Sequence, residues 1–395
     1  MTDTTALLQT IDEMKDEIVG TLQSLVRIPS ITGDEAKIGA FVADICRAME
    51  LEVEVLESAP GRPNVVATWD SGLPGPSLLL NDHLDMIPPG PLEYWTHPPF
   101  AAEIADGRVY GRGTIDTKSG VTTLLMAVTA MRRLQIPIRG KITLLFVCDE
   151  EVGGAMGIQW FAQTGRLKAD LAVVAEPTTM QIERATKGRM NIGITTRGIA
   201  THGARPWLGH NAIEDMAKIV LALAELGERI KSKTHPLLGH GSLSTGIIQG
   251  GTVPNMVPNK CRIEVDRRLI PGDTQESVLA EFQAVLDRIA AETPGFDASM
   301  EQLLWWPGYL VEEDEPIVRI AVTAFEKVMG YRPAITGKDA GTDASWINAL
   351  AGIPVVMFSP GNGKNAMNAD ENVVIEDLVN ATKVIAQIAC DVVGA

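Results

Sequence analysis

The sequence has little cysteine and no long apolar run, and both shortages narrow the kinds of protein it can encode. Its 395 residues include 4 cysteines, which lie far apart and in no Cys-x-x-Cys spacing. We therefore expect buried structural thiols rather than a disulfide framework or a thiolate metal site. No stretch reaches the roughly 18 consecutive apolar residues that a membrane-spanning helix needs. The cysteines are Cys46, Cys148, Cys261 and Cys390.

Positive charge is also in short supply. The chain has 34 lysines and arginines against 50 aspartates and glutamates, which gives a formal net charge of −16. No basic run interrupts this balance, and a protein of this charge is repelled by nucleic acid and by anionic membranes. The N-terminus, Met1 to Thr5, lacks the basic and then apolar pattern of a secretory signal. We expect a cytoplasmic protein that binds neither nucleic acid nor membrane.

Histidine is rare, with 6 residues and none after His240, but His83 lies at an informative position. It closely follows the apolar run Leu78–Leu80, which predicts a buried strand, and Asp85 comes two residues later. In open α/β sheets, ligands collect at the carboxyl ends of such strands, so polar side chains at these ends are expected to meet. Further acidic side chains that follow predicted strands or a glycine-rich turn are Asp116, Glu150, Glu151 and Glu176.

This set of side chains matches the needs of a hydrolytic metal site. Such a site uses imidazole for affinity, carboxylates to offset the charge of the ion, and one spare carboxylate as a general base. Taken alone, His83 and Asp85 fit an ordinary polar turn, and the Glu150–Glu151 pair fits a solvated helix start. The joint pattern favours metal-assisted hydrolysis, because each cluster follows an apolar run typical of buried parallel strands.

On these residues the sequence resembles a group of metal-dependent peptidases and amidohydrolases, which comprises aminoacylase, carboxypeptidase G, acetylornithine deacetylase and succinyl-diaminopimelate desuccinylase. The resemblance extends from about Leu22 to about Val379, and the order and spacing of its motifs are specific. The segments that carry it are Asp82-His83-Leu84-Asp85, Trp95–Phe100, Gly111–Gly120, Asp149-Glu150-Glu151, Glu176-Pro177-Thr178 and Thr201–Pro206.

The resemblance implies a ligand for each of two metal positions. By position in these motifs, His83 and Glu176 would bind one ion, Asp116 would bridge two ions, and Glu151 would bind the second. The peptide bond between Asp116 and Thr117 would be cis, as it often is in this group.

The resemblance also implies three residues that act on the reaction. Glu150 would be the general base that takes a proton from the attacking water. Asp85 would orient His83 by accepting a hydrogen bond from its other ring nitrogen. His202 would reach from an inserted domain into the active site of a partner subunit and stabilise the oxyanion.

One position departs from the family pattern. A histidine near the C-terminus normally completes the second metal site, and Met367 stands in its place. A thioether is a poor ligand for zinc or manganese, so we expect a divalent metal, Zn or Mn, at one tight site and doubt the second. Two alternatives stay open: a replacement oxygen ligand such as Asn368 or Asp370, and a relative that has lost catalysis.

Besides His202, four residues are candidates for substrate binding because they align with family segments that bind carboxylate or backbone polar groups. An arginine fork suits a planar carboxylate, which favours Arg268, although a surface ion pair would also explain it. Asn255 also fits a turn, and the run Gly341, Thr342 and Asp343 also fits a helix cap. The four candidates are Arg268, Asn255, Gly341 and Thr342.

The order of predicted elements indicates an α/β fold with two domains. Helical and apolar strand patterns alternate through residues 1–185 and resume over 302–395, which predicts a doubly wound, mostly parallel sheet. The resemblance implies that this sheet is of the zinc-peptidase kind. Residues 186–301 have a β-α-β-β-α-β pattern typical of a ferredoxin-like insert. The resemblance implies that this insert is a lid and dimerisation domain, so a homodimer is expected.

The leading functional hypothesis is a metal-dependent hydrolase of an amide or related C–N bond in a small carboxylate-bearing molecule, such as an N-acyl amino acid or a dipeptide. One alternative is an aminohydrolase that deaminates an activated aromatic amine. Another is a non-catalytic protein that binds a small acid. A dinuclear aminopeptidase without a lid fits poorly, because the insert is long.

Overall fold

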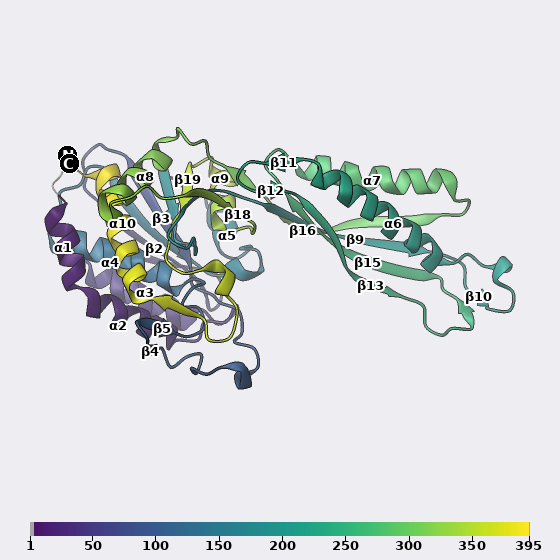
Figure 1. Ribbon diagram of the computed structural model, residues 1–395, viewed down its shortest axis with the longest axis horizontal. Coiled ribbons are helices and arrows are strands. Elements are labelled where there is room, and N and C mark those ends of the chain that lie inside the picture. Colours follow the sequence, from purple (N-terminus) through teal and green to yellow (C-terminus); the bar gives the residue numbers. More distant parts are fainter. Residues whose placement is uncertain (1–3, 395) are drawn as a thin grey trace. The chain divides into compact units, whose positions relative to one another are not determined.

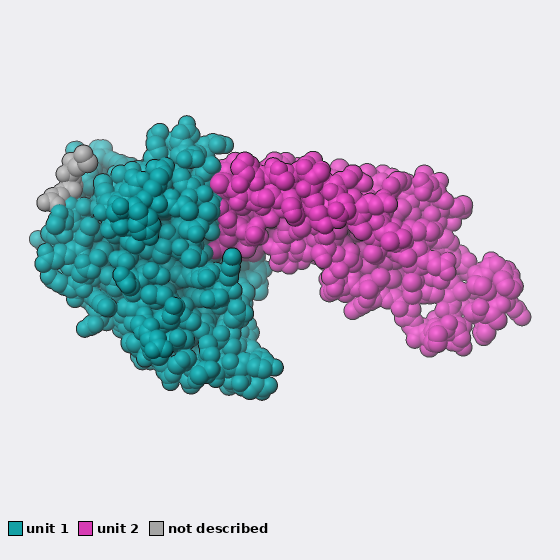
Figure 2. Space-filling view, viewed as in Figure 1, with its two compact units in different colours: residues 1–184, 311–336, 342–395 teal, residues 185–310, 337–341 magenta. Residues whose placement is uncertain are grey.

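The computed structural model describes residues 4–394, which form two compact units (Figures 1 and 2). Unit 1 contains the described residues up to Arg184, then Val311–Thr336, and the chain from Thr342 onward. Unit 2 contains Ala185–Leu310 and Gly337–Gly341. It extends beyond the predicted boundary at residue 301, because the last strand of its sheet continues to Trp306.

Unit 1 is built on a mixed sheet whose central strands are parallel, as predicted. The strands run in the order β1-β2-β6-β3-β7-β19-β8, and β6, β3, β7 and β19 are mutually parallel. The outer neighbours β2 and β8 pair with this parallel group in the antiparallel sense. The strands are β1 (Glu52–Ala59), β2 (Arg62–Asp70), β3 (Ser77–His83), β6 (Lys141–Val147), β7 (Leu171–Val174), β8 (Ile182–Thr186) and β19 (Val355–Met357).

Helices cover both faces of the central strands. Successive side chains of β3 point to opposite faces, and all of them from Leu78 to His83 are buried, so neither face meets solvent. Helices α4 and α10 pack against β3 and β6, whereas α9 packs against β3, β7 and β19. The helices of unit 1 are α1 (Thr5–Glu13), α2 (Lys15–Val26), α3 (Ala36–Ala48), α4 (Lys118–Arg133), α5 (Ile158–Gln163), α8 (Pro316–Met329), α9 (Asp343–Ala351) and α10 (Ile375–Val393).

A small sheet in unit 1 joins distant parts of the chain. Its order is β20-β5-β4, so the segment after Met367 pairs with the segment that leads to Asp116. The three strands are β4 (Glu103–Ala105), β5 (Arg108–Tyr110) and β20 (Asn372–Val374). Short 3-10 turns occur at η1 (Leu92–Tyr94), η2 (Glu150–Val152) and η4 (Gly363–Asn365).

Unit 2 is an antiparallel sheet with two helices on one face (Figure 1). Its chain order is β9-α6-β13-β15-α7-β16, which is the predicted β-α-β-β-α-β pattern. The sheet order is β13-β15-β9-β16, so β13 and β16 form its edges. The elements are β9 (Gly188–Arg197), α6 (Ala212–Lys231), β13 (Ser242–Gly250), β15 (Lys260–Leu269), α7 (Gln275–Glu292) and β16 (Asp297–Trp306).

Short elements complete the description. β10 (Thr201–His202) pairs with β14 (Met256–Val257), and β11 (Thr234–His235) pairs with β12 (Gly239–His240). η3 (Pro206–Leu208) follows β10, and β17 (Tyr309–Leu310) and β18 (Ile335–Lys338) lie where the chain passes between the units. All four cysteines are free and buried. None of the helices within residues 4–394 is both long and apolar enough to cross a bilayer.

The start of α7 yields a stability prediction. Thr274 accepts a hydrogen bond from the backbone N–H of Ser277, and the Ser277 hydroxyl in turn accepts from the backbone N–H of Thr274. Replacing Thr274 by Ala should lower the free energy of unfolding by about 1 kcal/mol, because the backbone N–H of Ser277 loses its acceptor. Thr274→Ser should retain most of this stabilisation, as measured by urea unfolding. Equal free energies of unfolding for all three proteins would contradict the assignment of Thr274 as the N-cap.

Candidate active site

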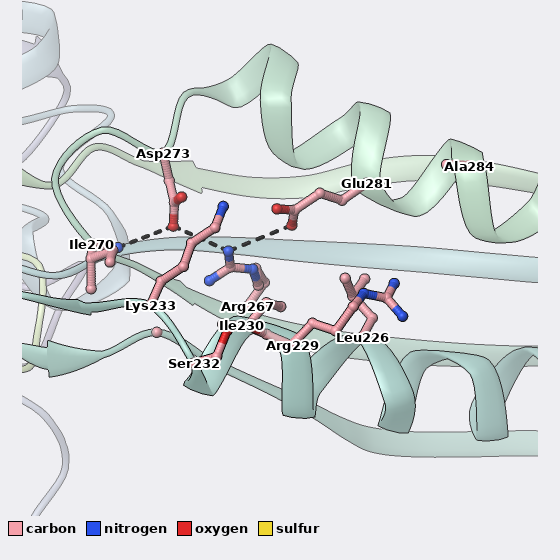
Figure 3. Close-up of a pocket in the computed structure, with 11 residues that line it drawn as sticks. Leu226, Arg229, Ile230, Ser232, Lys233, Arg267, Ile270, Asp273, Glu281 and Ala284 are labelled. Atoms are coloured by element: carbon pink, nitrogen blue, oxygen red, sulfur yellow. Dashed lines mark hydrogen bonds and ion pairs between the residues drawn. The ribbon is translucent and has the colours of Figure 1, made fainter.

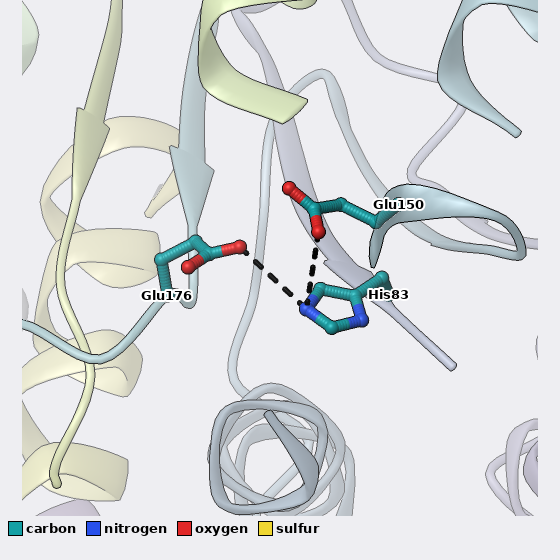
Figure 4. Close-up of side chains that lie close together, drawn as sticks. All are labelled: His83, Glu150 and Glu176. Atoms are coloured by element: carbon teal, nitrogen blue, oxygen red, sulfur yellow. Dashed lines mark ion pairs between the residues drawn. The ribbon is translucent and has the colours of Figure 1, made fainter. Parts of the chain in front are cut away.

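Three side chains from three strand ends meet in the interior of unit 1 (Figure 4). His83 is the last residue of β3, Glu150 lies in η2 after β6, and Glu176 follows β7. Nε2 of His83 lies 3.9 Å from Oε2 of Glu150 and 3.6 Å from Oε1 of Glu176. One ligand atom from each of the three residues lies within 4.8 Å of the others, a spacing compatible with a shared metal ion.

Asp116 joins the same group from the loop before α4. Its Oδ1 lies 3.2 Å from Nε2 of His83. The carboxylate of Glu371 holds this loop, because its Oε1 accepts hydrogen bonds from the backbone N–H groups of Ile115, at 2.7 Å, and Asp116, at 3.2 Å. The Asp116–Thr117 peptide bond is cis, as the resemblance implies.

Asp85 contacts His83 differently from the expected arrangement. Nδ1 of His83 lies 2.9 Å from the backbone oxygen of Asp85, and 3.5 Å from its carboxylate. A proton on Nδ1 can therefore be donated to this carbonyl, which leaves Nε2 free to act as a ligand. The carboxylate instead accepts from the backbone N–H groups of Glu150, at 3.0 Å, and Glu151, at 3.3 Å. It thus fixes the backbone that carries both glutamates.

The turn before the glutamates is held by a buried ion-pair network. Asp149 has a left-handed backbone, with φ of 73°. The guanidinium of Arg62 donates to Asp149 at 2.5 Å and to Glu35 at 2.8 Å. Asp149 also accepts from the backbone N–H of Met156 at 3.0 Å. Because both sides of the turn are tied to Asp149, the positions of the next two side chains are constrained.

The electrostatics of the cluster fit a divalent cation. Burial raises the pKa of Glu150 well above its ordinary value; the imidazole of His83 opposes the shift and the charge of Glu176 adds to it. Burial and then the charge of Asp116 raise the pKa of Glu151 to about 9, and its Oε1 is buried without a hydrogen bond from a described residue. Burial lowers the pKa of His83, but the hydrogen bonds with Asp116 and Asp85 and the charge of Glu150 outweigh it, so the pKa is raised well above its ordinary value. Crowded carboxylates around one imidazole are a donor set that suits a divalent metal ion.

Asp343 is a buried acid of this region; the run Gly341–Asp343 aligns with a family substrate-binding segment, but Asp343 itself was not among the named candidates. Thr342 caps α9 by accepting from the N–H of Ala344 at 3.2 Å, so the predicted cap is present and Asp343 is free for another role. Its carboxylate oxygens are buried without a hydrogen bond of good geometry in the described chain, although Asn81 lies near. Burial, opposed by His83 and reinforced by Glu176, raises the pKa of Asp343 to about 8. Its position directly after Thr342 was the only sequence signal.

The segment that departs from the family pattern is held away from a ligand role. Met367 has a φ of 66° and a side chain that is 48% exposed, and its backbone oxygen accepts from Arg112 at 3.0 Å. Oδ1 of Asp370 accepts from the N–H groups of Thr96, at 2.8 Å, and His97, at 3.0 Å. The side-chain amide of Asn368 donates to the oxygen of Lys364 at 3.4 Å, and its backbone oxygen accepts from Arg112. These contacts disfavour Asn368 and Asp370 as replacement ligands.

The predicted residues of unit 2 lie in two places. His202 is exposed in β10, and its Nδ1 accepts from the N–H of Ala204 at 3.1 Å. Asn255 lies beside this strand, because its backbone oxygen accepts a hydrogen bond from the backbone N–H of Gly203 at 2.8 Å. Arg268, on β15, donates from Nε to Asp266 at 2.8 Å, so the ion-pair explanation applies to at least part of its guanidinium.

Gly341 and Thr342 have structural reasons for their identity. A Cβ added to Gly341 would lie 2.7 Å from Nε1 of Trp306, so a larger residue would collide with the indole. Thr342 is buried and serves as the N-cap of α9. Their assignment to substrate binding stays a prediction.

Comparison with known proteins decides the family. The model of peptidase family M20/M25/M40 matches residues 79–391. The chain belongs to this family. It is accordingly a metal-dependent hydrolase that acts on C–N amide bonds, as the sequence predicted, and its candidate metal site is the cluster around His83.

Similar proteins extend over nearly the whole chain. An N-formyl-4-amino-5-aminomethyl-2-methylpyrimidine deformylase of Bacillus subtilis is 28% identical over 411 residues, covering 96% of this chain and 95% of its own. A protein of the same description from Halalkalibacterium halodurans is 26% identical over 410 residues, with the same coverage. The crystal structure of a tripeptidase from Staphylococcus aureus is similar in fold, with a TM-score of 0.77, 24% identity, and coverage of 95% of this chain and 97% of that one.

The crowded carboxylates predict how stability depends on pH. In chelator-treated protein, Glu151 with a pKa of about 9 and Asp343 with a pKa of about 8 hold protons more tightly when folded than when unfolded. Their contribution to stability is therefore present below about pH 4 and is lost as pH rises through 8 and 9. Urea unfolding should show this loss, and a bound divalent ion should reduce it. A stability that stays constant or rises over this range would contradict the account.

The position of Met367 predicts the metal stoichiometry. Titration of chelator-treated protein with Zn²⁺ or Mn²⁺ should show one tight site per chain, because the resemblance implies a histidine ligand where this chain has Met367. His83→Ala should remove that site, whereas His97→Ala, a change to a partly exposed histidine outside the cluster, should leave it intact. Calorimetry that finds two equally tight sites in the unaltered protein would overturn this expectation.

Proposed function

We propose that this protein hydrolyses the amide bond of a small N-acyl amine or N-acyl amino acid with one Zn or Mn ion per active site. The observation that supports the proposal most strongly is the convergence of His83, Glu150 and Glu176, with Asp116, at the carboxyl ends of the parallel strands. His83, Asp116 and Glu176 would hold the ion, with Glu151 beside them. When bound, the ion would lower the pKa of water and polarise the substrate carbonyl.

Glu150 would perform the proton transfers. It lies 3.9 Å from Nε2 of His83, close to the proposed ligands yet not required as one of them. Its raised pKa makes it a stronger base once it is deprotonated. In this proposal Glu150 accepts a proton as water attacks the carbonyl carbon, and it returns that proton to the nitrogen as the C–N bond breaks. Asp85 keeps the Glu150 backbone in place during both transfers.

Two substrate classes follow from different observations. The predicted role of Arg268 and Asn255 favours a substrate that carries a carboxylate, because a guanidinium can bind it through two hydrogen bonds. The names of the two relatives instead favour a formyl group on an aminomethylpyrimidine. Both reactions break an amide bond and need the same base. They differ in the acyl group and in the amine that it is attached to.

We also propose a cytoplasmic homodimer that forms through unit 2. β13 is an edge strand, and its Ile248 is 59% exposed, while Leu221 on the neighbouring helix α6 is 69% exposed. An unpaired edge beside exposed apolar side chains suits a second copy of the same strand around a two-fold axis. His202 would then act in the partner subunit's active site. The four free, buried thiols are compatible with a reducing compartment.

The dimer proposal has a direct test in solution. Ile248→Lys should shift the protein from dimer to monomer in sedimentation experiments, because it places charge in the proposed interface. Leu303→Lys, at a position that is 42% exposed on β16 at the opposite edge of the same sheet, is the matched control and should remain dimeric. A monomeric unaltered protein, or a dimer unaffected by Ile248→Lys, would count against the proposal.

The catalytic proposal is tested by a hydrolysis screen of metal-loaded protein. The panel should contain N-acyl amino acids, dipeptides, the N-formyl aminomethylpyrimidine and activated aryl amines. Glu150→Gln should lower kcat by about 10²- to 10⁴-fold without loss of metal, because proton transfer is removed. Glu57→Gln, a change at an exposed glutamate, should not alter the rate.

The same screen distinguishes the alternatives. Release of ammonia from an aryl amine with no amide hydrolysis would indicate a deaminase. Binding of acids without turnover of any compound would indicate a non-catalytic binding protein. Full activity in Glu150→Gln would show that another group is the base.

A further inference from the structure

An arginine occupies a core position of unit 2. The residues of β15 alternate between buried and partly exposed, and the buried row faces the helices. Arg267 lies in this row between Val265 and Leu269, and only 2% of its surface is exposed. Burial of a guanidinium is costly, and an apolar residue of similar size usually stabilises a core at least as well. Packing alone therefore does not explain an arginine here.

The charge of Arg267 is met by two carboxylates, which lie on either side of it (Figure 3). Its Nη2 lies 3.1 Å from Oδ2 of Asp273 and 3.5 Å from Oε2 of Glu281. Its Nη1 donates to the backbone oxygen of Arg268. Asp273 comes from the turn after β15 and Glu281 from α7, so the guanidinium ties both elements to the sheet.

A cavity of about 500 Å³ lies over this ion-pair group, between the C-terminal part of α6 and the middle of α7. This volume is within the range of small-molecule sites in proteins. Gly241 lines the cavity beside Arg267. A Cβ at this position would lie 2.6 Å from Nη1 of Arg267, so a larger residue would collide with the guanidinium. Apolar walls complete the cavity, and they are formed by Leu226, Ile230, Ile270 and Ala284.

Two further cations line the cavity from α6 and the turn that follows it. Arg229 lies in the last turn of α6, and Lys233 follows the C-cap Ser232; both line the cavity. Neither has an ion-pair partner in the described part of the chain, whereas the nearby Lys231 pairs with Glu228 at 2.6 Å. In a chain with a net charge of −16, unpaired cations beside a cavity form an unusual positive site.

We propose that this cavity binds a small organic monocarboxylate with an aliphatic or aromatic body. Arg229 and Lys233 contact the carboxylate, and the body lies against Leu226, Ile230 and Ala284. The charge count favours a monoanion, because three cations face two carboxylates around the cavity, and Asp273 and Glu281 would repel a second negative charge. All lining residues belong to unit 2, so the site is separate from the cluster around His83.

The test uses 4-phenylbutyrate as the probe and its neutral amide as the matched compound. Calorimetry on full-length, chelator-treated protein keeps the metal centre from binding the probe. The unaltered protein should bind the carboxylate saturably and at least tenfold more tightly than the amide. The double variant Arg229→Gln/Lys233→Gln should lose at least tenfold in affinity. Lys231→Gln, on the same helix but outside the cavity, should bind as the unaltered protein does.

A second variant tests the cavity without changing its charge. Ala284→Phe should fill the space and abolish binding, and its circular dichroism and melting temperature should show that it remains folded. The proposal is overturned if the probe does not bind, if the amide binds equally well, or if both the double variant and Ala284→Phe bind the probe normally. None of these measurements depends on hydrolytic activity.

Discussion

The mutual repulsion of buried carboxylates around one imidazole is the interaction on which this structure depends. Glu150, Glu176 and Asp116 approach Nε2 of His83 within 3.9 Å, and Glu151, which is partly buried, follows Glu150 in the chain. No fold gathers such groups without a cost, because burial disfavours each charge and neighbouring charges add to the penalty. A divalent cation converts this penalty into binding energy, and the same ion supplies what amide hydrolysis requires.

The protein maintains this arrangement through backbone contacts rather than through the ligands alone. Asp85 accepts from the N–H groups of the two glutamates and offers its own carbonyl to His83. Glu371 does the same for the loop of Asp116, and it is itself paired with Arg112 at 2.5 Å. Arg112 also binds the backbone of Met367, so the segment that lacks the family histidine remains attached to the site. The backbone around the predicted ligands is therefore fixed by contacts from outside the cluster.

Much of the fold could be predicted because it follows from local patterns. The strands β3, β6 and β7 contain the apolar runs Leu78–Leu80, Leu144–Val147 and Leu171–Val174. Such runs are typical of strands buried on both faces, and the polar residues at their carboxyl ends were expected to lie at one sheet edge. Other features depend on tertiary contacts between distant residues. Asp343 is brought near Glu150 by the packing of α9 against the sheet. An arginine in the sequence suggests a surface position, and the burial of Arg267 follows from the register in which β15 pairs with β9. The roles of individual site residues remain predictions.

The central claim is that the buried carboxylates near His83 hold protons when no metal ion is bound. A divalent cation would displace these protons when it binds. The claim is tested most directly by counting protons released when Zn²⁺ or Mn²⁺ binds chelator-treated protein at about pH 7, using calorimetry in buffers of different ionisation enthalpy. The account predicts tight binding with release of at least one proton per ion, and loss of both in His83→Ala. Tight binding with no proton release, or no binding at all, would contradict it.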